Sequence, residues 1–154
     1  METEGRLDPS VPERYVHLIK DVLRRLPLGW DRGVLWRVTA SNDQPSKGFA
    51  YVSSTDRAVM VVTLYPGKMN QLSDDACRFV IAHEFGHVAP TLPLHAVING
   101  RHYLFVDGKW KISSASAERL EELYEDVADL LVEDWGLTQE AAAFEREIAN
   151  LTSE

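Results

Sequence analysis

The stretch His83-Glu84-Phe85-Gly86-His87 decides how the rest of the chain is interpreted. On a helix, residues four apart lie on one face, so His83 and His87 can bind one small cation through their imidazoles. Glu84 lies about 100° around the helix from His83, close enough to reach a water on that cation without binding the cation itself. The alternative is a pair of core histidines that are hydrogen-bonded to backbone carbonyls. The spacing favours a zinc site.

The residues around this stretch indicate a buried helix. Ser73 is a good N-cap, and Asp74 complements the positive end of the helix dipole. The segment is apolar nearly all round until it ends near Ala89, so we expect it to pack against a sheet. Gly86 costs about 1 kcal/mol relative to alanine within a helix. It indicates close packing or room for a ligand, unless it is simply a tolerated glycine.

Upstream of the zinc-site helix, the sequence predicts one helix and three strands. The helix begins after Ser10-Val11-Pro12-Glu13, which has capping-box spacing, and its apolar stripe ends at Pro27. The strands are expected at Val34–Thr39, Phe49–Ser53 and Ala58–Tyr65. Short links between them predict an antiparallel meander whose apolar face is covered by a helix.

Downstream, Thr91–Gly100 is expected to be a loop that contains proline. Asp107-Gly108 separates His102–Val106 from Lys109–Ile112, which is a strong signal for a hairpin with a type I′ turn. A long acidic helix is predicted from about Ala117 to Trp135, and a last helix begins at Thr138. We therefore expect an α+β fold with an inserted hairpin. It forms a single domain over 1–154, with its core at about 10–135 and its C-terminal helix at about 138–151.

Composition narrows the class of protein. The 154 residues are 45% apolar and 26% charged, as in an ordinary globular domain. The formal net charge of −8 argues against nucleic acid as the main partner. No segment resembles a signal peptide or a membrane span, and the single cysteine, Cys77, fits a reducing compartment. We therefore expect a cytoplasmic protein whose oligomeric state is open.

A catalytic zinc site normally has three protein ligands, so a third ligand is required. The position six residues after His87 is Pro93, which leaves His95, His102 or a carboxylate on the acidic helix. Placed at steps of 100°, Glu125 falls at the edge of that helix's apolar arc and is favoured. Glu122 and Asp126 fall deeper in its polar arc. The helix also carries the carboxylates Glu118, Glu121 and Asp129.

Asp129 lies one turn after Glu125, on the same side of the acidic helix. It can accept a hydrogen bond from the second ring nitrogen of a ligand histidine, which fixes the tautomer and strengthens the ligand. The alternative is that Glu125 and Asp129 are ordinary solvent-exposed charges.

Together the two motifs resemble a known family. His83-Glu84-Phe85-Gly86-His87 followed by Glu125-Asp126-Val127-Ala128-Asp129 looks like the gluzincin arrangement, and the second motif is most similar to ImmA/IrrE-type metallopeptidases. The resemblance covers roughly residues 10–135. It implies one zinc ion per chain, bound by His83, His87 and Glu125. It also implies that Glu84 is the general base and that Asp129 orients a ligand histidine.

The function that follows is a zinc-dependent endopeptidase acting on an intracellular protein or peptide. Zinc would activate a water molecule, and Glu84 would take its proton and pass it to the leaving amine. A further donor should stabilise the oxyanion, and the candidates are Tyr103, His102, Tyr124 and Arg78. Substrate is expected to pair with an edge strand that contains Met60, Val61 and Val62.

Two other functions remain open. One is a regulatory or binding module that keeps the zincin fold without cutting, although such a module has no need of Glu84. The other is a purely structural zinc protein, which is weaker because structural sites usually have four ligands rich in cysteine. In the enzyme, the segment Thr91–Ile112 would be a specificity element or lid.

Overall fold

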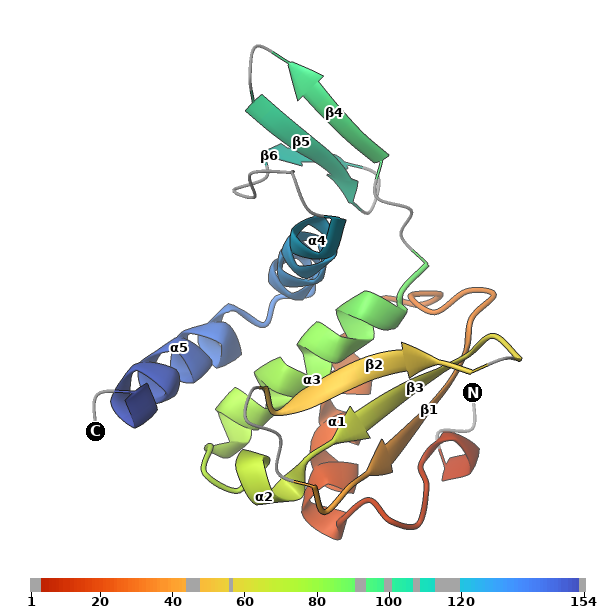
Figure 1. The fold of residues 1–154 in the computed structure, drawn as a ribbon, viewed down its shortest axis with the longest axis vertical. Coiled ribbons are helices and arrows are strands. Elements are labelled where there is room, and N and C mark those ends of the chain that lie inside the picture. The colour runs from red at the N-terminus through yellow and green to blue at the C-terminus, as the bar shows by residue number, and fades with distance from the viewer. Residues whose placement is uncertain are drawn as a thin grey trace.

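The computed structural model describes residues 4–43, 48–55, 57–90, 94–98, 101–106, 109–112 and 120–152 (Figure 1). At residue 4, within 94–124, and at 126 and 152, it describes the backbone alone. Five α-helices of four to fifteen residues and six strands follow a short 3₁₀ turn at Glu4–Arg6. In chain order they are α1 (Glu13–Arg25), β1 (Leu35–Ala40), β2 (Ala50–Ser54), β3 (Val59–Leu64), α2 (Pro66–Met69), α3 (Asp74–Val88), β4 (Leu94–Ile98), β5 (Arg101–Val106), β6 (Lys109–Ile112), α4 (Leu120–Asp134) and α5 (Thr138–Thr152). The α+β class predicted from the sequence is confirmed.

The main sheet has the order β1-β3-β2 and is mixed. β2 and β3 are antiparallel, with Val52 opposite Val62, as their short connection requires. β1 pairs with β3 in parallel, with Val38 opposite Val62 on the other side. The predicted meander is therefore wrong for β1, because the longer link from β1 to β2 lets the chain cross to the far side of β3.

The strand order also corrects the expected substrate edge. Met60, Val61 and Val62 lie in β3, which is hydrogen-bonded to a neighbour on both sides. A central strand has no free row of backbone donors and acceptors for a peptide to pair with. The edge strand on the side of β3 away from β1 is β2.

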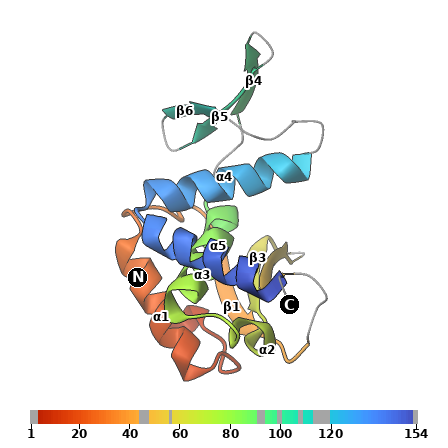
Figure 2. The same ribbon diagram turned by 90° about the vertical axis from the view of Figure 1, so that its left-hand side faces the viewer.

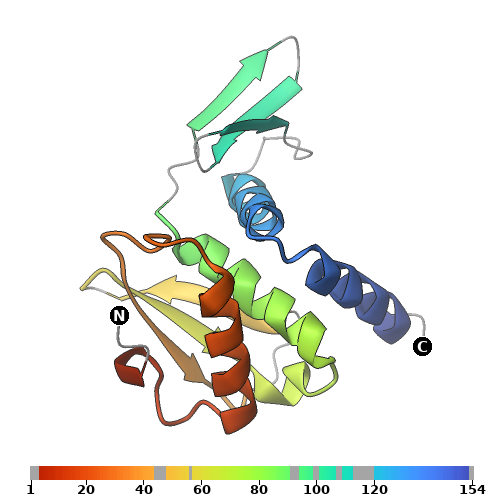
Figure 3. The same ribbon diagram turned by 180° about the vertical axis from the view of Figure 1, so that it is seen from behind.

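Two helices, α1 and α3, cover one face of this sheet (Figure 3). The sheet contributes inward residues such as Trp36, Val38 and Val62, and α1 contributes Ile19 and Val22, all at most 3% exposed. Burying each such aliphatic side chain contributes about 1.5–3 kcal/mol to folding. The core therefore forms between the sheet and these two helices.

The helix α3 begins as predicted. The Ser73 hydroxyl accepts a hydrogen bond from the backbone N–H of Ala76 at 3.3 Å, so Ser73 is its N-cap. Phe85, in the last turn of the helix, packs its ring against Trp30 and Trp36 with centroids 5.1 Å away in each case. Because Phe85 is fully buried, these contacts fix the rotation of α3 about its own axis.

The last two helices pack on α3 from outside the sheet. Figure 2 shows α4 crossing α3 near its C-terminal end, with α5 lying alongside. Arg25 of α1 donates hydrogen bonds to Glu140 and to the carbonyl of Gly136, and so holds the start of α5. Glu147 holds its middle by accepting from the Ser73 N–H at 2.6 Å and the Ser73 hydroxyl at 2.5 Å. α5 is therefore tied to both α1 and α3.

A second sheet of three antiparallel strands, β4-β5-β6, lies beyond α4 from the main sheet (Figure 1). The hairpin predicted for β5 and β6 is confirmed, with Phe105 opposite Trp110. The expectation of a loop throughout Thr91–Gly100 is wrong, because Leu94–Ile98 pairs with β5. Among the helices that the structure describes, none combines the length and the apolar character that crossing a membrane requires.

Candidate metal centre

The two histidines of α3 point to one spot. They lie four residues apart, and their Nε2 atoms are 3.2 Å from each other. Their side chains are 15% and 18% exposed, so each imidazole is mostly enclosed. The helix thus presents two nitrogen ligands side by side, as the spacing predicts.

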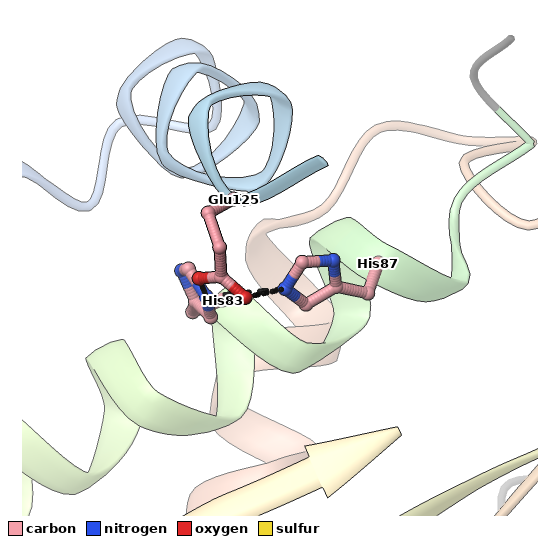
Figure 4. A group of neighbouring side chains, drawn as sticks. All are labelled: His83, His87 and Glu125. Carbon is pink, nitrogen blue, oxygen red and sulfur yellow. Dashed lines mark hydrogen bonds and ion pairs between the residues drawn. The ribbon is translucent and has the colours of Figure 1, made fainter. Parts of the chain in front are cut away.

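The third group comes from α4. Glu125 extends from that helix toward both imidazoles (Figure 4), with Oε2 at 2.8 Å from His83 Nε2 and Oε1 at 3.1 Å from His87 Nε2. One ligand atom from each of the three residues lies within 4.8 Å of the others. Three side chains from two helices therefore converge, although His83 and Glu125 are 42 positions apart in the sequence.

This donor set fits a zinc ion. Catalytic zinc is commonly bound by three protein groups that combine histidine nitrogen and carboxylate oxygen, at about 2.0–2.2 Å. Tetrahedral ligands at those distances lie about 3.3 Å from one another. The observed separations of 2.8, 3.1 and 3.2 Å require an adjustment of at most about half an ångström. The one cysteine that a soft metal would prefer, Cys77, is buried elsewhere, against the carbonyl of Met69.

Asp129 contacts the outer side of His83. Its Oδ1 lies 2.9 Å from His83 Nδ1. Because an ionised carboxylate only accepts, Nδ1 donates in this hydrogen bond, and Nε2 is the ring atom left to face Glu125 and His87. Asp129 thereby holds the imidazole of His83 with its Nε2 toward the other two residues.

Gly86 lets α4 approach α3 closely at Ala128, near the point where Glu125 reaches the histidines. A Cβ atom built on Gly86 would lie 2.9 Å from Ala128 Cα and 3.1 Å from Ala128 Cβ and carbonyl oxygen. No side chain fits there without moving the backbone of α4. The sequence does not distinguish close packing at Gly86 from room for a ligand or a merely tolerated glycine. The structure shows that this glycine permits close packing of the two helices.

Glu84 borders the cluster without joining it. Its residue is 8% exposed, and it lines two pockets, one on each side of Glu125. Burial raises the pKa of the Glu84 carboxyl, although His83 and His87 oppose this effect. A carboxylate that holds its proton more readily than usual is suited to take one from water.

The metal-free cluster is held by ion pairs. Burial lowers the pKa of His83, but hydrogen bonds with Asp129 and Glu125 outweigh that effect and raise the pKa to about 10. Hydrogen bonds with His83 and His87 hold the pKa of Glu125 well below its usual range. Without a metal, a protonated His83 therefore bridges two carboxylates, and a bound cation would take over this role.

Of the remaining candidate site residues from the sequence, the structure describes the side chain of Arg78. Arg78 bonds Asp75 at 2.8 Å and Asp21 at 3.1 Å, so its guanidinium is engaged away from the cluster and it is wrong as an oxyanion donor. The side chains of the other candidates lie outside the described residues: His95, His102, Tyr103, Glu122, Tyr124 and Asp126. Gly86 and Ala128 were not recognised as a pair, because only the fold brings them into contact.

One comparison with known proteins gives a match. The model of Peptidase family M48 matches residues 13–104, well over half of the chain. The chain belongs to peptidase family M48. As a member of this family it is a metallopeptidase, so its substrate is a protein or peptide, and the family is normally zinc-dependent. No curated protein and no solved structure shows significant similarity to the chain.

The M48 match runs from α1 into β5 and includes His83, Glu84 and His87. It ends before α4, so Glu125 and Asp129 lie beyond it. The broad prediction of a metallopeptidase is thus supported. The narrower resemblance to ImmA/IrrE-type metallopeptidases depends on the Glu125–Asp129 motif and stays a prediction.

Proposed function

We propose that this M48 chain is a zinc-dependent endopeptidase that cleaves a protein or peptide in the cytoplasm. The observation that carries the proposal is the convergence of His83, His87 and Glu125 within 4.8 Å, with Glu84 at its border. We assign the first three residues as the ligands of one zinc ion. Asp129 orients His83.

A zinc ion at this position would acidify a water molecule and polarise the carbonyl of the scissile bond. Glu84 accepts the proton of the attacking water and delivers it to the leaving amine. Its burial supports this role, because a carboxylate in a site of low polarity has a raised pKa and shuttles a proton more readily near neutral pH.

The substrate backbone is assigned to β2 in place of the central strand. β2 is an edge strand, and Ala50, Tyr51 and Val52 line a pocket together with Glu84, His87 and Glu125. A peptide that adds to this edge would pass directly beside the ligand residues.

The test compares Glu84→Gln with Glu133→Gln. Glu133 is a matched control because it is an exposed carboxylate on α4. Zinc content is measured by elemental analysis, and cleavage is measured on an unfolded casein substrate. We expect wild type and both variants to bind about one zinc per chain, and Glu84→Gln alone to lose about 10²- to 10⁴-fold in rate.

Two results would contradict the proposal. Equal cleavage by Glu84→Gln and wild type would show that Glu84 is not the general base. A zinc-loaded wild type that binds unfolded chains without cutting them would instead favour the regulatory or binding module.

A further inference from the structure

A cavity of about 640 Å³ opens beside the ligand cluster, on the His83 side. Cavities of about 300–1,000 Å³ are typical of sites that enclose small organic groups. This one is lined by the metal-centre residues His83, Glu84, Glu125 and Asp129, and also by Gly48, Phe49, Ala50, Phe79, Val80, Phe144, Glu145, Ile148 and Ala149. A group bound in it would lie next to the bond that the proposed enzyme cleaves.

Aromatic rings form part of the wall of the cavity. The ring of Phe144 lies 4.8 Å from that of Phe79 and 5.7 Å from that of Phe49, measured between centroids. Phe79 in turn lies 5.9 Å from His83. The aromatic wall therefore leads directly to the ligand histidine, and it offers ring faces and edges against which another apolar group can pack.

The outer wall is α5, which lies beyond the segment matched by the M48 model. This helix contributes Phe144, Glu145, Ile148 and Ala149 to the lining. It is held in place by the contacts of Glu147 with Ser73 and of Glu140 with Arg25. The cavity is thus built in part by a segment that the family match leaves out.

The charged groups around the cavity are mostly acidic. Glu84, Glu125, Asp129 and Glu145 line it, and no Lys or Arg occurs in the lining that the structure describes. The basic group in this lining, His83, is already paired with Glu125 and Asp129, so an acidic side chain would find no unpaired basic side chain there. A large apolar side chain instead gains the contacts of the aromatic wall.

We propose that this cavity is the specificity pocket of the peptidase and receives a large apolar side chain, aromatic or branched aliphatic, from a substrate residue adjoining the scissile bond. The position of that residue next to the cleaved bond rests on the proposed function. The binding of the apolar group does not, because α5, Phe49 and Phe79 build the pocket without a metal.

Cleavage mapping tests the specificity. The cleaved bonds of unfolded casein are identified by mass spectrometry for wild type, Ile148→Trp and Gln139→Trp. Ile148 lines the cavity, whereas Gln139 is an exposed residue of α5 that does not. At the substrate position that adjoins the cleaved bond, we expect wild type and Gln139→Trp to prefer large apolar residues over alanine by at least about tenfold. Both proteins should avoid Asp and Glu at the same position. Ile148→Trp should shift the preference to small residues.

An unchanged preference in a folded Ile148→Trp variant would overturn the proposal, as would wild-type cleavage with no bias toward apolar residues. Circular dichroism establishes whether the variant is folded.

A binding measurement separates this proposal from the proposed function. Metal-free wild type is titrated with N-acetyl-phenylalaninamide or N-acetyl-alaninamide while the methyl signals of Ile148 and Ala149 are followed by NMR. We expect saturable shifts with the phenylalanine compound alone. Equal or absent shifts would refute the pocket. Selective shifts in a zinc-loaded protein that cleaves nothing would keep the apolar pocket and refute the peptidase.

Discussion

The two helices that meet at the metal centre are stabilised in different ways. Nine of the fifteen residues of α3 are buried, and Ile81, Ala82 and Phe85 are at most 1% exposed. α4 has one buried face, and the side chains of Glu125 and Asp129, which reach α3 from that helix, are 61% and 58% exposed. The hydrophobic core therefore fixes the positions of the histidines, whereas the positions of the carboxylates depend on how closely α4 approaches α3.

This difference indicates which substitutions leave the site residues in place and which move them. A change on the surface of α3 leaves the histidines in place, because the rings of Trp30, Trp36 and Phe85 fix the helix. On α4, the approach is set by the contact of Gly86 with Ala128 and by ion pairs to His83. We expect substitutions that act through α4 to change metal binding in a graded way.

The largest effect is expected for Glu125→Ala, with Glu133→Ala as the control on the same helix. Loss of Glu125 leaves two protein ligands, so zinc affinity should fall by more than the roughly 10- to 100-fold that is typical of losing an outer hydrogen-bond partner. Titration against a fluorescent zinc chelator measures it. Equal affinity in both variants would show that the third ligand is another residue.

Asp129→Asn should have the next largest effect. The amide keeps the size of the side chain but removes the charge that orients His83 through Nδ1. Zinc affinity should fall about 10- to 100-fold, with the free energy of unfolding of the zinc-free protein also reduced. An unchanged zinc affinity would mean that the α3 core alone fixes the imidazole.

Gly86→Ala tests the contact between the helices directly. The added methyl group would overlap the backbone of Ala128, which costs about 1–3 kcal/mol, offset by about 1 kcal/mol of better helix propensity. Urea unfolding should show a net loss of up to about 2 kcal/mol, together with weaker zinc binding. Gly5→Ala is the control, since a Cβ on Gly5 meets nothing within 4 Å.

The smallest effect is a pH dependence of the metal-free protein. Folding raises the pKa of His83 to about 10 from its ordinary 6.5, so the stability it contributes is complete below pH 6.5 and is lost as the pH rises through 10. Between pH 7 and pH 8 the free energy of unfolding should fall by about 1 kcal/mol. Urea unfolding at both values checks this, and the fall should be smaller in Asp129→Asn.

Sequence reasoning was successful where a residue's role depends on its own helix. The Ser73 cap and the histidine spacing are local properties, and both were predicted. Glu125 was reached by placing residues around a helix, which works because one side of α4 must face the core. Ser10 shows the limit: its hydroxyl accepts from the Ala40 N–H at 3.1 Å instead of capping α1, whose N-cap is Pro12.

Sequence reasoning failed where partners are distant. The parallel pairing of β1 with β3 depends on which side of β3 the chain crosses to, and no local pattern encodes that. The role of Gly86 depends on Ala128, 42 positions later, and the apolar wall depends on α5 lying beside Phe79. These are tertiary contacts, and periodicity along one segment carries no information about them.

The position of β2 at the edge of the sheet also gives the bound peptide a direction. Gly48 and Phe49, just before this strand, line the apolar cavity, and Ala50 lines both pockets. Tyr51 and Val52 line the pocket on the His87 side. A peptide that pairs antiparallel with β2 runs the opposite way, with its amino end toward the His87 side. The apolar side chain would then belong to the residue that follows the scissile bond, and after cleavage it would be the new N-terminal residue of the released fragment.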